Sequence, residues 1–222
     1  MRYTRYEYKK SGSFKFILAV VIVAVLSITA GLCISNVLFT KGKSILQNES
    51  IGFSEKLNNK VQTTNIVVLQ CGFYSKKENA DVLMSSIKQY CYPFISEEDG
   101  NYRVIAGIYN QDEAEKKIKQ FQENGVEVSK TTISLKPDSN DDKKIIEISD
   151  GFLKIMSKLE EADVKSIKTN DFKNWCNNVI GNENEYGEKL KAMINYVHNL
   201  PDEIDKNNNS SEAYEFYKLI KR

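Results

Sequence analysis

The longest apolar stretch of the chain covers residues 16–39 and contains no charged side chain. A helix over these residues would be about 36 Å long at 1.5 Å per residue. The hydrocarbon core of a bilayer is about 30 Å thick, so such a helix is long enough to cross it with some tilt. A helix at the surface of a soluble protein would have a polar face, and this stretch has none. The pattern predicts one membrane-spanning helix over residues 16–39.

The charges that flank this stretch predict its orientation. Residues 1–15 carry five basic side chains against the single acidic Glu7, whereas only Lys41 and Lys43 follow closely behind the stretch. The more basic flank usually stays in the cytoplasm. We therefore expect a basic cytoplasmic tail over 1–15, a polar stalk over 40–64, and the bulk of the chain outside a cell membrane that it spans once. A cleaved signal peptide is disfavoured because the apolar stretch is too long. Lipoprotein cleavage before Cys33 is disfavoured because Leu32 stands where a small residue is expected.

Two stretches after residue 64 repeat one pattern. Each has an apolar run rich in Val, Ile or Tyr, then Gly, an apolar residue, Tyr, a polar residue suited to cap a helix, and Glu three positions later. The glycines are Gly72 and Gly107. Ser75 with Glu78 is a capping-box pattern, as is Asn110 with the Glu three positions after it. Each repeat therefore predicts a strand that leads into a helix.

Two further strands complete a six-element unit. Residues 93–97 and 126–135 have strand-like composition, Asp99-Gly100 is a hairpin turn signal, and Asn124-Gly125 is a helix stop. The predicted order over residues 65–135 is β-α-β-β-α-β. This order is typical of a ferredoxin-like α+β fold, a four-stranded antiparallel sheet with two helices on one face. The other face is then open to solvent or to a ligand.

Alternation along the predicted strands assigns side chains to the two faces. In the first strand, Val67, Leu69 and Cys71 are expected under the helices, and Ile66, Val68 and Gln70 on the open face. In the third strand, Val104, Ala106 and Ile108 are expected in the core, and Arg103, Ile105 and Gly107 on the open face.

The remainder of the chain is helical in pattern. Residues 136–142 read as a polar linker that contains Pro137. Residues 143–222 then carry four amphipathic stripes, the second ended by Gly181 and the third near Pro201. We expect a small bundle-like helical tail. Its apolar stripes either pack on one another or dock a partner protein.

Composition excludes several functions. The formal net charge of +1 lacks the basic excess of general nucleic-acid binding. The four cysteines are scattered and His198 is the only histidine, so the sequence predicts no metal site. A disulfide between Cys71 and Cys91 stays open, because pairing cannot be read from sequence. No pair of carboxylates or nucleophile with its base is specified, and we expect no catalytic residue, no cofactor and no enzyme activity.

The two repeats resemble the motifs of a known family. Residues 68–80, Val-Leu-Gln-Cys-Gly-Phe-Tyr-Ser-Lys-Lys-Glu-Asn-Ala, and residues 102–107, Tyr-Arg-Val-Ile-Ala-Gly, are similar to the two signatures of the SPOR domain (sporulation-related repeat). The resemblance covers about a third of the chain. It implies binding to the glycan strands of bacterial peptidoglycan, especially strands stripped of stem peptides, and localisation at sites of cell division or sporulation septation.

The resemblance also implies a binding site on the open sheet face. Gln70 and Arg103 match the motif residues that contact glycan, and amide and guanidinium groups suit sugar oxygens. Phe73 could offer a flat face to a sugar ring. Asn101 stands where some members carry an aromatic residue, and Ile105 shares the face. Thr131 and Ile133 of the last strand are expected to border the groove.

Three hypotheses for function follow. The first is a non-catalytic protein that binds peptidoglycan glycan strands and faces the cell wall from the membrane. The second is a membrane-anchored interaction module whose C-terminal helices bind a divisome or wall-synthesis protein. The third is RNA binding, which uses the same fold order, but Cys71, Ile105 and the expected location outside the cell oppose it.

Overall fold

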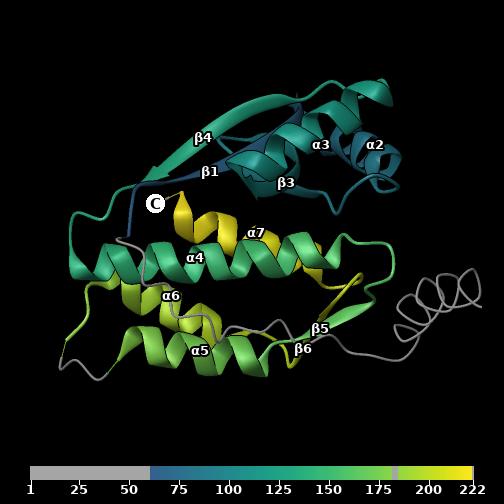
Figure 1. Ribbon diagram of the computed structural model, residues 1–222. Helices are drawn as coiled ribbons and strands as arrows, with labels where there is room; N and C mark the ends of the chain where they lie inside the picture. The colour runs from purple at the N-terminus through teal and green to yellow at the C-terminus, as the bar shows by residue number, and fades with distance from the viewer. Residues whose placement is uncertain (1–60, 182–184, 222) are drawn as a thin grey trace, which may run out of the picture. The chain divides into compact units, whose positions relative to one another are not determined.

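The first half of the structure is built on one antiparallel sheet. The computed structural model describes residues 61–181 and 185–221, and every structural statement below refers to these residues. The elements follow in the order β1 (Thr64–Tyr74), α2 (Lys77–Ile87), β2 (Phe94–Glu98), β3 (Asn101–Asn110), α3 (Gln111–Glu123) and β4 (Ser129–Leu135). The strands are ordered β2-β3-β1-β4, and every neighbouring pair is antiparallel (Figure 1). This is the β-α-β-β-α-β arrangement expected from the two repeats.

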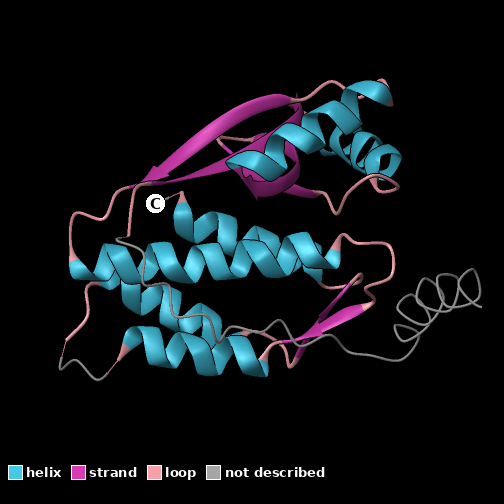
Figure 2. Ribbon diagram, viewed as in Figure 1, coloured by secondary structure: helices cyan, strands magenta, loops and turns pink. Residues whose placement is uncertain are grey.

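The second half is mainly helical. It contains α4 (Asn140–Leu159), α5 (Asn170–Ile180), α6 (Glu188–Asn199) and α7 (Asn209–Ile220), as Figure 2 shows. These four helices, called here the C-terminal helices, correspond to the four amphipathic stripes of the sequence. Two three-residue strands, β5 (Ser166–Lys168) and β6 (Glu203–Asp205), pair beside them. No sequence pattern indicated this pair, because three residues are too few to establish a period of two.

The predicted fold class requires a correction where it includes a membrane-spanning helix. Within residues 61–181 and 185–221, no helix has both the length and the apolar character needed to cross a membrane. The longest, α4, carries charged side chains such as Asp141, Lys144 and Lys154 along its length. The predicted location, a cell-membrane protein with one span, is corrected on the same finding. Residues 16–39, on which that prediction was based, lie outside the described residues, as do the tail over 1–15 and the stalk up to residue 60.

Local signals explain how several elements begin and end. The Asn110 side chain caps α3 by accepting a hydrogen bond from the Glu113 N–H at 2.9 Å. Asp99 and Gly100 form the two-residue turn between β2 and β3 with φ of 51° and 72°, the left-handed backbone that such hairpins need. Ser75, predicted to cap a helix, does not do so. The helix α2 begins at Lys77 and has no side-chain cap, because β1 continues to Tyr74 before the chain turns.

Each repeated Gly-x-Tyr motif has a packing role. A side chain at Gly107 would meet the ring of Tyr109, and one at Gly72 would meet the ring of Tyr74, in both cases closer than 3.0 Å. Each tyrosine therefore folds back over the glycine two positions before it. The repeated pattern of the sequence marks this close approach of a ring to the backbone.

Two bulges change the faces assigned from simple alternation. Leu69 lies opposite Gly107 and Gln70 opposite Ile105, so Ala106 is an extra residue in β3. Because of it, Ile108 lies on the face of Ile105 instead of under α2 and α3, and Gly107 lies on the opposite face, both contrary to prediction. Opposite Val104, β1 has already reached Gly72, so Cys71 is the extra residue in β1.

The helices α2 and α3 cover one sheet face, as predicted. Their core contains Val67, Leu69, Val104 and Ala106 from the strands, together with Phe121 from α3. Tyr109 also lies in this core, and its hydroxyl donates a hydrogen bond to the Glu160 carboxylate at the end of α4, at 2.9 Å.

The opposite sheet face, called here the distal face, is not open as the sequence suggested. Its residues Ile66, Val68, Ile105 and Ile108 are buried and share one continuous core with the C-terminal helices. In Figure 1, α7 and α4 lie on the side of the sheet away from α2 and α3. Phe94 of β2 packs against the rings of two α7 tyrosines, with centroids 5.7 and 5.8 Å away. The apolar stripes of the C-terminal helices therefore pack on one another and on the sheet.

Candidate functional site

A polar cluster centred on Arg103 occupies the end of the distal face that stays partly exposed. The Arg103 Nη1 donates to the Gln70 Oε1 at 3.0 Å, and its Nε donates to the Glu98 Oε2 at 3.2 Å. The guanidinium carbon also lies 4.6 Å from the centroid of the Phe73 ring. Arg103 is the only arginine between residues 61 and 221, and 35% of its side chain is exposed. The cluster fixes the guanidinium in one plane and leaves part of it accessible.

The bulge at Cys71 brings Phe73 into this cluster. Strict alternation would place Phe73 on the face opposite to Gln70, but the extra residue shifts it by one. Phe73 then lies directly opposite Arg103, and facing residues of antiparallel strands share a side of the sheet. The Phe73 side chain is 50% exposed, one of two large hydrophobic residues so exposed in the described part of the chain. Its ring therefore offers an apolar surface next to the guanidinium.

Glu98 connects the cluster to α7. Its carboxylate accepts hydrogen bonds from the Ser96 hydroxyl at 3.0 Å and from the Tyr217 hydroxyl at 3.4 Å, and it forms an ion pair with Lys221. Burial alone would raise the pKa of Glu98. The hydrogen bonds from Lys221 and Ser96 and the positive charges of Lys221 and Arg103 outweigh that effect, so the pKa lies below its usual value. The carboxylate is therefore ionised at neutral pH and holds Arg103 and Lys221 near each other.

These residues enclose a pocket of about 320 Å³. It is lined by Val68, Gln70, Glu98, Arg103, Ile105, Thr131, Ile133, Tyr217 and Lys221. The floor is apolar, and an amide, a guanidinium, a carboxylate, a phenol and an ammonium group converge above it. Such a site combines an apolar surface with several hydrogen-bonding groups of fixed direction, which suits a ligand rich in hydroxyl and amide groups.

The predicted site residues do not all lie in the pocket. Gln70, Arg103 and Phe73 come together as described. Ile105 is 1% exposed and belongs to the pocket floor. Asn101 lies at the β-turn, where its Nδ2 donates to the Asp99 carbonyl at 3.1 Å, and it does not line the pocket. Thr131 and Ile133 border the pocket where the sequence placed them.

Three pocket residues were not found by sequence reasoning. Tyr217 and Lys221 belong to α7, more than a hundred residues away along the chain, and no sequence pattern connects them to the sheet. Glu98 was not among the predicted site residues. The register with β3 could have suggested its position, because a residue two positions from Ser96 on a strand shares the face of Arg103.

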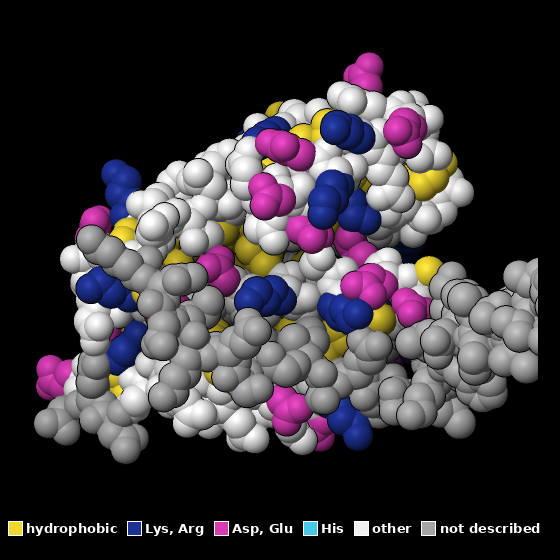
Figure 3. Space-filling view, in the orientation of Figure 1, with side chains coloured by type: hydrophobic (Ala, Val, Ile, Leu, Met, Phe, Trp, Pro, Cys, Tyr) yellow, Lys and Arg dark blue, Asp and Glu magenta, His cyan; other side chains and the backbone are white. Residues whose placement is uncertain are grey.

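The described residues also bear on whether the chain has a metal site, a disulfide or reactive thiol, or a nucleic-acid-binding surface. They contain no group of three or more His, Cys, Asp or Glu side chains able to hold a metal ion. Cys71, Cys91 and Cys176 are free thiols, so Cys71 and Cys91 are not joined. Burial raises the pKa of Cys71 to about 11 and that of Cys176 to about 12. On the face seen in Figure 3, basic and acidic side chains are interspersed and form no continuous basic surface.

The fold and this site define a small binding domain of the β-α-β-β-α-β class whose polar cluster lies on the sheet face opposite its helices. Residues 64–128 match the family model of the SPOR domain, and the chain carries a SPOR domain over this region. No curated protein matches the chain. Among solved structures, it is similar to the solution structure of the peptidoglycan binding domain of the B. subtilis cell wall lytic enzyme CwlC. That similarity has 22% sequence identity and a TM-score of 0.30, and it covers 33% of this chain and 96% of that chain.

Proposed function

We propose that this protein is a non-catalytic binding protein whose SPOR domain binds peptidoglycan glycan strands at the Arg103 cluster. The observation that carries the proposal is the convergence of Gln70 and Arg103 at a pocket, with the exposed Phe73 ring beside Arg103; all three residues lie within the region that matches the SPOR family. In this arrangement the guanidinium and the amide contact sugar oxygens and acetamido groups, and the Phe73 ring packs on a sugar face.

The covered distal face limits how a glycan binds. The buried part of this face is sealed by α4 and α7, so only the end near Phe73 and the pocket beside Tyr217 and Lys221 are accessible. A contact of this size, with few hydrogen bonds, implies an affinity on the order of micromolar. We expect strands without stem peptides to bind best, as the family resemblance implies.

Sedimentation of the full chain with purified peptidoglycan tests the proposal. The double variant Gln70→Ala/Arg103→Ala is expected to lose most of the pelleted fraction. Arg103→Lys is expected to lose a large part of it as well, because a lysine keeps the charge but not the planar donors. The control is Gln89→Ala/Lys119→Ala, which removes an amide and a cation exposed elsewhere on the domain. Equal pelleting of both double variants would contradict the proposed site.

The finer function is recruitment to wall that is being remodelled at division or sporulation septa. Its support is the family resemblance together with the expected preference for stripped glycan. A fluorescent fusion is expected to concentrate at septa, and the Gln70→Ala/Arg103→Ala fusion to spread over the cell. The alternative that C-terminal helices dock a divisome partner through their apolar stripes gains no support here, since those stripes are buried in the chain's own core.

A further inference from the structure

A second feature of the sheet, separate from the Arg103 cluster, is the free edge of β2. Within the described residues, β2 pairs with β3 alone. The two-residue turn makes Glu98 and Asn101 a hydrogen-bonded pair, and bonded and non-bonded pairs alternate along an antiparallel ladder. The N–H and C=O groups of Ile95 and Glu97 therefore point away from β3, toward the open edge.

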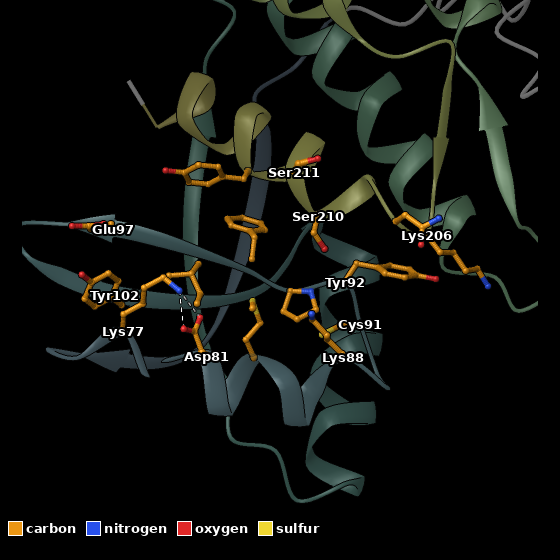
Figure 4. A pocket seen from close by; sticks show the side chains of 16 residues that line it. Lys77, Asp81, Lys88, Cys91, Tyr92, Glu97, Tyr102, Lys206, Ser210 and Ser211 are labelled. Carbon is orange, nitrogen blue, oxygen red and sulfur yellow. Dashed lines mark hydrogen bonds and ion pairs between the residues drawn. The ribbon is translucent and has the colours of Figure 1, made fainter. Parts of the chain in front are cut away.

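A pocket surrounds this edge. It has a volume of about 720 Å³, within the usual range for ligand sites. The strand β2 contributes Phe94 from one face and Ile95 and Glu97 from the other, while Met84 of α2 and Tyr214 of α7 stand on either side. In Figure 4 the strand runs between α7 and α2, with Ser210 of α7 on one side and Lys77 and Asp81 of α2 on the other. The open backbone groups thus lie at the bottom of a groove with two walls.

Charge is unevenly distributed along this groove. Lys88 and Lys206 lie at the end that holds Tyr92, and the part of the chain that the structure describes gives neither an ion-pair partner (Figure 4). At the opposite end, Lys77 is neutralised by Asp81 at 2.7 Å, and Glu97 adds a negative charge. A strand added antiparallel to β2 would end beside the two free lysines.

We propose that the groove binds an extended segment of a partner protein, which adds to the β2 edge as an antiparallel fifth strand and carries acidic residues at its C-terminal end. The Ile95 and Glu97 backbone groups supply the main-chain hydrogen bonds, as in other cases of strand addition. Alternate side chains of the segment contact Met84 on one wall and Tyr214 on the other. Charge complementarity with Lys88 and Lys206 favours a partner segment with an acidic end as the occupant, and a second copy of this chain is an outcome that the test distinguishes.

The inference does not depend on the glycan site, since neither Gln70 nor Arg103 lines this groove. The probe is a labelled seven-residue peptide of alternating valine and threonine that ends in two aspartates. Fluorescence anisotropy with the full chain measures its binding. Amide hydrogen exchange followed by NMR reports which backbone groups it covers. The control peptide has the same sequence but carries N-methyl groups on the alternate amides that would face β2.

Binding of the first peptide is expected to protect the amides of Ile95 and Glu97, while the amide of Ser96, already bonded to β3, changes little. The N-methylated peptide is expected not to bind. Equal binding of the two peptides would overturn the proposal, as would binding without protection of these two amides. Protection of the Ile95 and Glu97 amides from exchange in the protein without peptide would also overturn the proposal. If that protection rose with protein concentration, a second copy would be the occupant, and if it did not, another segment of this chain would be.

Two pairs of variants test the chemistry of the groove. Glu97→Pro removes one outward N–H and is expected to weaken binding about tenfold, whereas Glu97→Thr keeps the N–H and should bind normally. Lys88→Glu/Lys206→Glu is expected to weaken binding of the aspartate-ended peptide about fivefold and to favour a lysine-ended one. Circular dichroism and thermal unfolding confirm that each variant is folded. If the charge reversal left the affinities of both peptides unchanged, the proposed acidic C-terminal end of the partner segment would be contradicted.

Discussion

At the scale of single residues, the contact between the sheet and α4 depends on the buried carboxylate of Glu160. It forms an ion pair with Lys117 of α3 at 2.7 Å and accepts a hydrogen bond from the Tyr109 hydroxyl. The two charged side chains are only 14% and 17% exposed. Burial raises the pKa of Glu160, and the Lys117 charge and the hydrogen bonds from Lys117 and Tyr109 oppose that rise. Lys117 and Tyr109 therefore favour the ionised form of the carboxyl group, which burial disfavours.

Replacing Lys117 by methionine should expose this dependence. The variant is expected to lose about 3 kcal/mol of unfolding free energy at neutral pH, because an unpaired charge stays buried. Its Glu160 pKa rises further above the unfolded value. The free-energy cost of the buried unpaired carboxylate is then complete above the folded-state pKa. It disappears as the pH falls toward the pKa of the unfolded state, near 4.5.

Urea denaturation at pH 7.5 and at pH 5 measures this difference. The loss of unfolding free energy relative to the natural sequence should be smaller at pH 5, where the Glu160 carboxyl group of the variant is partly protonated. Lys116→Met, an exposed position on the same helix, is the control and should change stability by less than about 0.5 kcal/mol at either pH. A deficit of equal size at both pH values would show that the loss does not come from the buried charge.

At the scale of elements, the two repeats differ in how their helices begin, although both carry the same capping pattern in the sequence. Asn110 caps α3, whereas α2 has no side-chain cap. A capping pattern indicates which residues could form the capping hydrogen bond, but it does not indicate where the preceding strand ends. Pairing of Tyr74 with Tyr102 keeps the chain extended almost as far as Ser75, so the tertiary contact sets the start of α2.

Alanine substitutions at the two positions should separate the real cap from the apparent one. Asn110→Ala is expected to cost about 1 kcal/mol of unfolding free energy, because the Glu113 N–H loses its partner. Ser75→Ala is expected to change it by less than about 0.5 kcal/mol. Urea denaturation of both variants under identical conditions makes the comparison. A similar loss for both would mean that Ser75 caps α2 in solution.

At the scale of the whole molecule, the sheet and the C-terminal helices share one hydrophobic core. Residues of β1, β2 and β3 belong to the same buried cluster as residues of α4, α5, α6 and α7. Phe94 is a central link, since its ring contacts Tyr214 and Tyr217. A shared core of this kind should unfold in one cooperative step, because neither half can leave without uncovering the apolar surface of the other.

Phe94→Ala tests that cooperativity. The cavity is expected to cost about 3–5 kcal/mol of unfolding free energy. Native-state hydrogen exchange should show an equal fall in protection for core amides of β1 and for those of α5 and α6. Val82→Ala, at a side chain that is 71% exposed, is the control and should leave exchange unchanged. A loss confined to the sheet amides would show that the two halves unfold independently.

Sequence patterns were sufficient to predict the strands and helices of residues 64–135 and the four C-terminal helices. They also pointed to Gln70, Arg103 and Phe73, which the structure brings together. These features depend on local periodicity, turn residues and family motifs, all of which are read within a few residues. Burial of the distal face under the C-terminal helices became known only from the packing of the folded chain. An amphipathic stripe indicates that a surface is buried, but not which surface covers it. In this protein the apolar sheet face and the apolar stripes of the helices pack against each other. The positions of Tyr217 and Lys221 beside Glu98, and the groove along β2, follow from that packing, because α7 forms a wall of both.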